Sequence, residues 1–340
     1  MILFFLFVFL YIIYIFKYEF PDHILYLLLC FFLFIICLLR NENNVFDYAG
    51  YKEIYNSILI GKTILIEPTF YLISIISGNY LTGISSLFFI YACLSLLPKF
   101  YLFKKLSYNP IQSLLLYSSN FFILHDLTQI RISVAIIFFL GLINIEIQNN
   151  KLKTIFLNLF GILFHYSFFI YTLSLPFRKF IISKWFYVSI VFFGYILYFF
   201  KISIFDFLIF FQSETVLTEK ASQYNNSLEN LQTNLFNPIF ILRLIFFLII
   251  LKNYTFLITI NRYFKIMFNY YFIGIICFIY FWKFPDFSGR FSEMFFILEI
   301  FLLPLLLSKI KYVYLRDLLV FAISILFLIL NFAYFKLIKI

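Results

Sequence analysis

The sequence predicts an all-helical, polytopic integral membrane protein that crosses the bilayer about ten to twelve times. Hydrophobic residues make up 64% of the 340 residues and charged residues only 12%, about half the charged share of a typical soluble domain. Long apolar stretches recur along the whole chain, and about 20 such residues cross the ~30 Å hydrocarbon core as a helix. These stretches are continuous instead of alternating, which argues against a membrane barrel.

The predicted spanning helices, in chain order, are 2–16, 23–39, 82–98, 111–125, 132–148, 154–176, 185–200, 237–251, 267–282, 291–308 and 318–335. Two further stretches, 67–77 and 202–212, are too short to cross in full. The first stretch lacks a basic start and a small-residue cleavage site, so we expect a spanning helix there and not a removable signal. Polar stretches at about 40–66 and 213–236 are predicted as external loops of a single membrane domain, 1–340.

Basic residues between the apolar stretches predict the topology. They form four clusters: Lys99, Lys104 and Lys105; Lys151 and Lys153; Lys252, Arg262 and Lys265; Lys309, Lys311 and Arg316. Placing all four in the cytosol puts 125–131 and 286–290 outside, together with 40–66 if 67–77 only dips into the membrane. Between 153 and 252 three crossings stand where an even number is needed. Either 202–212 completes a fourth, or 154–176 is broken near Gly161 and His165 and turns back.

Several classes of function are disfavoured by what the sequence lacks. The net charge of +10 is spread over short loops, whereas nucleic-acid binding calls for a basic stripe on a soluble domain. The four cysteines lie inside apolar stretches and are most simply buried small hydrophobes. There is no phosphate-binding GxxxxGK[ST] loop and no HExxH, and three scattered histidines argue against a metal site.

The first candidate site residues follow the second helix, in LLRNENNVFDYAGY. Arg40 either extends its charge to the membrane edge or binds a phosphate with its planar guanidinium. Asp47 is a candidate acceptor for a hydroxyl proton, and Tyr48 and Tyr51 are candidates for stacking on sugar rings. Glu67, just before Pro68, either caps the next helix or contributes a carboxylate to the site.

The second group lies in HDLTQIR, before the stretch 132–148. His125, Asp126 and Gln129 are three to four residues apart, so we expect them on one helical face. Arg131 enters an otherwise apolar helix, where an ionisable residue is a functional candidate; the alternative is an interfacial anchor.

The third and fourth groups are isolated polar residues in apolar surroundings. His165, in FHYS, is predicted near mid-membrane, where it needs polar partners, and Asn158 lies on the same helical face. It is either hydrogen-bonded structurally or a base or phosphate donor. Arg243 and Arg290 either point into a shared cavity that holds an anion, or Arg290 forms an ion pair with Glu293 at i+3.

The order of these motifs resembles the EpsG/Wzy-type polysaccharide polymerases. The pattern is Arg-x6-Asp-Tyr-x2-Tyr, then Glu-Pro-x-Phe-Tyr, then Gln-x-Arg at the start of a helix, then FHYS and a late GRF, over about residues 36–300. Family members usually carry Gly-x-Asp in the first motif, where this chain has Asn44, Val45 and Phe46 before Asp47.

The resemblance implies a metal-independent glycosyltransferase without a cofactor, with a GT-C-like fold, in the bacterial inner (cytoplasmic) membrane. It would join undecaprenyl-diphosphate-linked oligosaccharide repeat units of an O-antigen or capsule on the periplasmic face. Membrane lipid and a chain-length regulator are the other partners that it implies, and nucleic acid is not one. Its expected base is Asp47, Glu67 or His165. Its expected substrate-binding residues are Arg40, Tyr48, Tyr51, Gln129, Arg131, Arg243, Arg290 and Glu293, with the arginines neutralising the diphosphate.

Two other hypotheses use similar residues. A flippase of the same lipid-linked oligosaccharide would also need arginines in a cavity, but transporters often show repeated halves, and no repeat is visible. A membrane acyltransferase would depend on His125 or His165 with a carboxylate, and the excess of arginine over histidine argues against it.

Overall fold

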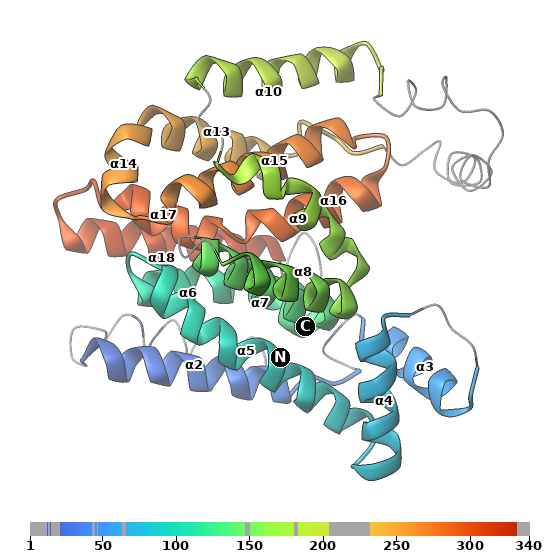
Figure 1. Cartoon of the computed structure of the whole chain (residues 1–340). Coiled ribbons are helices and arrows are strands. Elements are labelled where there is room, and N and C mark those ends of the chain that lie inside the picture. The colour runs from blue at the N-terminus through green and yellow to red at the C-terminus, as the bar shows by residue number, and fades with distance from the viewer. Residues whose placement is uncertain are drawn as a thin grey trace. The chain divides into compact units, whose positions relative to one another are not determined.

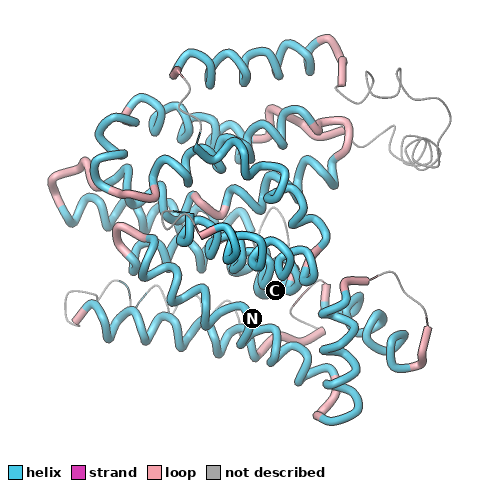
Figure 2. Tube along the Cα trace, viewed as in Figure 1, coloured by secondary structure: helices cyan, strands magenta, loops and turns pink. Residues whose placement is uncertain are grey.

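The computed structural model describes residues 12, 14, 21–42, 45, 47–62, 66–146, 150–179, 183–203 and 232–331. Most of these residues are helical, and Figure 2 draws no strand among them. The all-helical prediction is therefore confirmed for the described chain. Most of the predicted helix 2–16, of the short stretch 202–212 and of the predicted loop 213–236 lies outside the described residues.

The chain folds into two compact units: Met1–Thr172 with Ile300–Ile340 forms unit 1, and Leu173–Glu299 forms unit 2. Unit 1 contains α2 (Asp22–Leu38), α3 (Tyr48–Leu59), α4 (Pro68–Tyr80), α5 (Ile84–Leu106), α6 (Pro110–Ser119), the π-helix η2 (Phe122–Thr128), α7 (Ile130–Glu146), α8 (Lys151–Phe164), the 3-10 helix η3 (Tyr166–Phe168) and α18 (Val313–Ile329). Unit 2 contains the 3-10 helix η4 (Leu175–Lys179), α10 (Lys184–Phe199), α13 (Pro238–Lys252), α14 (Tyr254–Ile260), α15 (Phe264–Tyr280) and α16 (Pro285–Phe296). The chain leaves unit 1 within α9 (Phe169–Ser174) and returns within α17 (Glu299–Leu307). The single domain expected over 1–340 stays a prediction.

Polar caps define where four of these helices begin. The side chains of Asn109, Asn150, Ser183 and Asn237 each accept a hydrogen bond from a backbone N–H in the first turn of α6, α8, α10 and α13. This satisfies one of the donors that a helix start leaves without an internal partner. Proline follows Asn109 and Asn237 at the first helical position, where its missing N–H costs no helical hydrogen bond.

α5 runs further than the predicted helix 82–98. It passes through Pro98 and ends at Leu106, although an internal proline removes one helical hydrogen bond and usually kinks or ends a helix. Packing explains the difference, because Lys99, Phe100, Leu102, Phe103 and Leu106 are all buried beyond the proline. α6 is shorter than the predicted 111–125, since it ends at Ser119 and gives way to the π-helix.

The predicted helix 154–176 is broken at His165. A break near Gly161 and His165 was one of the two alternatives that the sequence left open for this region. α8 ends at Phe164, and His165 adopts an extended backbone. Thr172 then donates a 3.0 Å hydrogen bond to the side chain of Asn158, whereas fourteen residues of continuous helix would separate the two by about 21 Å. A Cβ on Gly161 would lie 2.5 Å from the ring of Phe168. The chain therefore turns back on α8, and glycine makes the close approach possible.

Residues 40–66 are not the simple loop that their polarity predicts, because they contain α3. Tyr51, Tyr55 and Ile58 share one face of this helix and are buried. That spacing is typical of an amphipathic helix, and the intervening polar residues hid it in the sequence. α3 packs on α4, which in turn contacts α5 and α8 (Figure 1).

The other helices of unit 1 pack around α5, α6 and α7. α2 lies along α5 and α6, α7 contacts α5 and α8, and α18 contacts α6 (Figure 1). In unit 2, α15 is the central helix, with α10 and α16 packed against it. The loop before α4, the start of α7 and the end of α8 are thereby held close together in unit 1.

By length and composition, one described helix could cross a membrane, namely α5. α13 and α14 would form a second span if they were one helix, but they are bent by 78°. α2, α10 and α15 are apolar but only 16 or 17 residues long, and the predicted stretch 291–308 is divided between α16 and α17. The ten to twelve crossings expected from the sequence thus stay a prediction.

Candidate functional site

Glu67 joins two residues that are far away in the sequence. Its Oε2 accepts a hydrogen bond from the guanidinium of Arg131, at the start of α7, and the two side chains form an ion pair. Its Oε1 lies 2.8 Å from Nδ1 of His165, the residue between α8 and η3. Three separate segments of unit 1 therefore meet at one carboxylate. This brings together three of the residues that the sequence selected.

The local backbone explains why Glu67 is available for these contacts. Glu67 is extended and occupies the N-cap position, with Pro68 starting α4, but its side chain makes no capping hydrogen bond. The capping role that the sequence left open is therefore wrong. His165 is also extended, and the break that it forms turns its imidazole toward Glu67 instead of continuing α8.

The electrostatics of the cluster favour an ionised carboxylate. The Glu67 side chain is only 4% exposed, and that of Arg131 is 24% exposed. Glu67 lies in the loop before α4, and its burial alone would raise the pKa of its carboxyl group. The hydrogen bond from His165 and the positive charge of Arg131 outweigh the burial and lower this pKa to about 2. Because an ionised carboxylate only accepts hydrogen bonds, His165 donates through Nδ1.

Two nitrogen atoms of the cluster have no hydrogen-bond partner. They are Nε2 of His165 and Nε of Arg131, and both are buried. Leaving a buried polar group unpaired costs about 1–3 kcal/mol, so native proteins seldom keep one without a reason. Both nitrogens belong to side chains whose other end is held by Glu67. Glu67 thus fixes the orientation of both side chains, but the hydrogen-bonding capacity of the cluster is not fully used.

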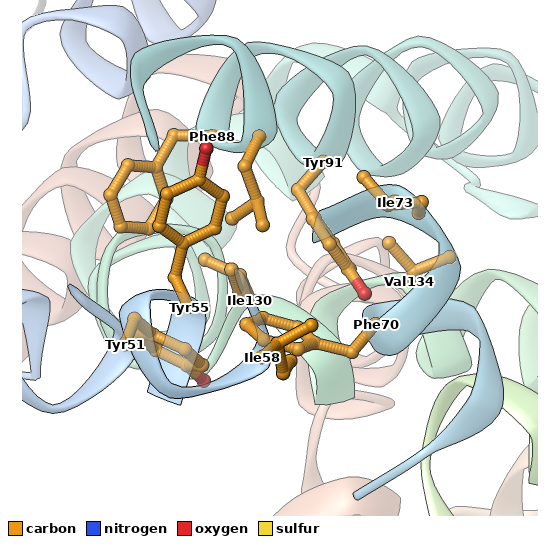
Figure 3. Close-up of a cluster of buried hydrophobic side chains, with 10 residues drawn as sticks. Tyr51, Tyr55, Ile58, Phe70, Ile73, Phe88, Tyr91, Ile130 and Val134 are labelled. Carbon is orange, nitrogen blue, oxygen red and sulfur yellow. The ribbon is translucent and has the colours of Figure 1, made fainter. Parts of the chain in front are cut away.

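Aromatic rings line the cluster. The Arg131 guanidinium lies 5.7 Å from the ring centre of Tyr51 and 5.6 Å from that of Phe70, at distances where cations are attracted to ring faces. Phe70 also contacts Tyr91, with ring centres 5.9 Å apart. Figure 3 shows these rings together with Ile130 and Val134 of α7. α3, α4, α5 and α7 each contribute to this wall.

Arg40 lies close to this wall but is bonded to protein atoms. It is buried, donates to the backbone carbonyl of Cys37 at 3.2 Å and to its sulfur at 3.0 Å, and lies 4.6 Å from the ring centre of Phe88. Tyr48 packs on the same ring at 4.8 Å. The expectation that Arg40 extends its charge to a membrane edge is therefore wrong. Asp47 precedes α3 and is half-buried, but Glu67 is the carboxylate that pairs with Arg131 and His165.

The segment His125–Arg131 differs from its prediction. Residues 122–128 form a π-helix, not the start of an α-helix. His125 and Gln129 interact as expected, with Nδ1 and Oε1 3.3 Å apart. The Asp126 side chain instead forms an ion pair with Lys99.

The ion pair of Lys99 and Asp126 was missed by the sequence analysis. Lys99 is fully buried within α5, so it is not one of the exposed loop residues that a basic cluster implies. Its Nζ lies 2.9 Å from both oxygens of Asp126 and also donates to Tyr117 at 3.0 Å and Ser133 at 2.6 Å. Asp126 also accepts from Ser95, Ser133 and Tyr117. No clear signal for this pair was present in the sequence, because Lys99 directly follows the predicted helix 82–98 and is buried only because α5 continues through Pro98.

Unit 2 contains a separate group of charged residues. Nε of Arg243 donates to Glu299 at 2.8 Å, Tyr271 donates to the same oxygen at 2.9 Å, and the guanidinium lies 4.3 Å from the ring centre of Phe296. Glu299, inside an apolar stretch, was another isolated charge that the sequence analysis passed over.

Arg290 and Glu293 complete the candidates of unit 2. Arg290 is exposed and Glu293 is half-buried. Both residues are described, and no ion pair joins them, so that alternative is wrong. Arg131 belongs to unit 1, whereas Arg243 and Arg290 belong to unit 2. The convergence of all three arginines on one cavity stays a prediction.

Among the described residues, no group of three or more His, Cys, Asp or Glu side chains could hold a metal ion. All four cysteines are described and carry free thiols. The Glu67 cluster combines one carboxylate, one guanidinium and one imidazole. This set can orient an imidazole and attract an anion through its own residues.

Comparison with known proteins gives one match. The family model of the EpsG family matches residues 23–339. No curated protein and no solved structure matches the chain. The matched range includes every candidate residue in both units, from Arg40 to Glu293, and it confirms the resemblance that the sequence motifs indicate.

Proposed function

The chain belongs to the EpsG family, and from this membership we propose that it is a membrane glycosyltransferase. In this proposal it polymerises oligosaccharide repeat units carried on undecaprenyl diphosphate, at the outer face of the bacterial cytoplasmic membrane. Family membership supports a polymerase-like role in polysaccharide synthesis. The observation that carries the mechanism is the cluster in which Glu67 holds Arg131 and His165 together.

A multi-pass membrane location is supported by the apolar surfaces of the helices. α2 exposes 65% of Leu27 and 60% of Phe31, and α10 exposes 81% of Trp185 and 82% of Phe199. Soluble monomers seldom expose large contiguous apolar patches, whereas hydrocarbon chains of a bilayer would cover such faces. The low share of charged residues, 12%, supports the same proposal.

The proposed base is Nε2 of His165. Glu67 accepts a hydrogen bond from Nδ1–H of His165 and so places the lone pair of the imidazole on Nε2, the arrangement that a carboxylate imposes on a catalytic histidine. Both oxygens of Glu67 are already engaged. Among the three carboxylate and histidine candidates, we therefore assign proton transfer to His165, positioning to Glu67 and no direct step to Asp47.

The proposed reaction is a glycosyl transfer. The hydroxyl oxygen of the acceptor sugar forms a bond to the anomeric carbon of the donor sugar, and the bond from that carbon to the diphosphate oxygen breaks. The hydroxyl proton passes to Nε2 of His165, and the lipid diphosphate leaves with the electron pair of the broken bond. Negative charge develops on the leaving group, where a preorganised cation lowers the barrier most.

Arg131 is the proposed cation nearest the reacting bond. Its Nε is buried and has no hydrogen-bond partner, so a phosphate oxygen that binds at this edge of the guanidinium would satisfy it. Arg243, Arg290 and Glu293 are proposed to contribute substrate contacts from unit 2, while Arg40 acts through its contacts with Cys37 and Phe88. Tyr48, Tyr51 and Gln129 are proposed to contact the sugars.

The surface glycan of cells that carry Arg131→Ala in place of the wild-type gene tests this function. We expect single repeat units on the cell-surface lipid, because units still reach the outer face but are not joined. Arg262→Ala is the matched control, since this exposed arginine donates to its neighbour Tyr263 and belongs to none of the candidate groups, and we expect full-length chains from it.

Two results would overturn the proposal. Full-length chains from Arg131→Ala at wild-type protein level would remove Arg131 from the reaction. A complete absence of surface units, with lipid-linked units accumulating inside, would indicate a flippase instead of a polymerase.

A further inference from the structure

An apolar groove and a polar pocket meet between α2 and α5, away from the Glu67 cluster. The groove has a volume of about 590 Å³ and the pocket about 290 Å³, and both are lined by His23, Tyr26 and Lys104. We propose that this joined site binds one membrane phospholipid with a phosphoethanolamine headgroup. This inference rests on the membrane location proposed above but not on the polymerase reaction.

The groove has the form of a channel for one hydrocarbon chain. α2 contributes Leu27, Phe31 and Phe34, and α5 contributes Leu97 and Tyr101. From His23 to Phe34 the groove follows α2 for about 16 Å, at 1.5 Å per residue. This is close to half of the ~30 Å hydrocarbon core, which is the depth of one leaflet.

The two helices are antiparallel along the groove, which gives it one polar end. Phe34 contacts Phe89, in the first half of α5, with ring centres 6.3 Å apart. At the other end, the hydroxyl of Tyr26 donates to the carbonyl of Phe100 at 2.6 Å, and Lys104 lies near the end of α5. The groove is therefore apolar at one end and cationic at the end where the polar pocket begins.

The polar pocket contains both a positive and a negative side chain. It is lined by Asp22 and Lys104, together with Tyr108 and Asn109. Asp22 and Lys104 are both described and exposed, and no ion pair joins them. A headgroup with a phosphate and an ammonium would match both charges, because the phosphate would meet Lys104 and the ammonium would meet Asp22. A headgroup with only negative charge would leave Asp22 facing a like charge.

Selectivity in this site comes from the headgroup. Lipid chains are as apolar as the groove, so burying one chain in place of another supplies little driving force inside a membrane. The two opposite charges of the pocket can supply binding free energy, because they would lie at the depth of the lipid headgroups and not among the hydrocarbon chains. In this proposal Asp22 and Lys104 determine which headgroup binds, and the groove holds one hydrocarbon chain of the lipid.

The test uses the full chain released from vesicles that contain equal amounts of phosphatidylethanolamine and phosphatidylglycerol, with retained lipids counted by native mass spectrometry. We expect the wild type to retain phosphatidylethanolamine preferentially. Asp22→Asn should reduce this preference about threefold, the size of effect that one exposed ion pair supplies, and Lys104→Ala should reduce retention of both lipids. Lys105→Ala is the matched control, because Lys105 is exposed, packs on Tyr101 and lines neither cavity.

Three results would overturn this lipid site. Preferential retention of phosphatidylglycerol, or equal effects of Lys104→Ala and Lys105→Ala, would indicate attraction to a general basic surface instead. A chain that retains no lipid at all would contradict both the site and the membrane location. The readout does not use glycan synthesis, so failure of the polymerase proposal would leave the lipid result unchanged.

Discussion

Unit 1 contains two buried charged clusters that differ in one respect, namely whether their hydrogen-bonding groups are all used. Lys99 and Asp126 form an ion pair in which the ammonium and both carboxylate oxygens have several protein partners. Glu67 likewise pairs with Arg131 and His165, but one nitrogen on each of those partners has none. The hydrogen-bonding groups of the first cluster are all used, and we call it closed; the second keeps two buried nitrogens without a partner, and we call it open in that sense alone.

The difference separates a structural role from a functional one. Replacing a closed, buried ion pair by apolar residues is often neutral for stability, whereas removing one partner is strongly destabilising. An open cluster carries a cost in the absence of a ligand, because its unpaired groups are desolvated without compensation. Binding a phosphate and a hydroxyl would satisfy those groups. The Lys99 pair should therefore affect folding, and the Glu67 cluster should affect the reaction.

The largest expected effect is on the reaction. His165→Gln removes the proposed base but keeps an amide that can still face Glu67, so the fold should persist. We expect the rate of polymer formation in membrane vesicles to fall about 10²- to 10⁴-fold, the range that general base catalysis contributes. His23→Gln is the matched control and should keep the wild-type rate, because His23 lies in the α2 groove. A His165→Gln enzyme with normal rate would assign the base to another residue.

The next effect is on stability. Lys99→Met leaves the Asp126 carboxylate buried without its cation, which should cost about 3–5 kcal/mol in the free energy of unfolding. The double variant Lys99→Met with Asp126→Leu should recover most of that loss, since no unpaired charge remains. Thermal unfolding in detergent compares the three proteins. A double variant that is less stable than Lys99→Met alone would contradict a structural role for the pair.

A smaller effect is expected at the turn that orients His165. Gly161→Ala would place a Cβ 2.5 Å from the ring of Phe168, and such overpacking typically costs about 1–3 kcal/mol. Polymer formation should fall as well, because the turn sets the direction of His165. Gly50→Ala in α3 is the control: its Cβ would have no neighbour within 4 Å, so stability should stay equal or rise. Unchanged polymer formation in a destabilised Gly161→Ala would show that the turn does not position His165.

The smallest effect is expected at the aromatic wall. Tyr51→Leu removes a ring beside the Arg131 guanidinium, and a cation–ring contact of this kind is worth about 0.5–2 kcal/mol. Tyr51→Phe keeps the ring but removes the hydroxyl that accepts a hydrogen bond from Arg131, so it should retain more activity than Tyr51→Leu and less than the wild type. Apparent affinity for the lipid-linked donor distinguishes the two variants. Equal affinities would mean that the ring does not stabilise Arg131.

The sequence predicted most of the helices but not how they end. Apolar length placed α2 and α10 within a residue or two, because both are uninterrupted stretches with polar flanks. It could not anticipate that α5 continues through Pro98, since the buried residues that support this continuation are a property of the packed unit. The break at His165 was foreseen as one alternative and needed the contact between Asn158 and Thr172 to decide it.

The sequence predicted which residues belong to the candidate site, but it did not predict which of them contact one another. Glu67, Arg131 and His165 were selected because isolated charges in apolar stretches are functional candidates. Nothing in their spacing indicates that one carboxylate holds the other two, because that contact depends on how α4, α7 and α8 pack. Lys99 was misassigned for the same reason: a basic residue near a helix end follows the rule for cytosolic loops until its partner Asp126 is seen.

Two isosteric replacements, one in each cluster, test the central claim most directly. Glu67→Gln and Asp126→Asn each replace one carboxylate oxygen by an amide nitrogen, and the measurement is the rate of polymer formation per folded protein in vesicles. Glu67→Gln should yield folded protein with a rate lowered at least about tenfold, because the amide keeps only one acceptor oxygen for His165 and Arg131 and gives Arg131 no counter-charge. Asp126→Asn should yield less folded protein, and the protein that folds should keep the wild-type rate. The account is contradicted if the effects are exchanged, with Asp126→Asn lowering the rate per folded molecule and Glu67→Gln leaving it unchanged.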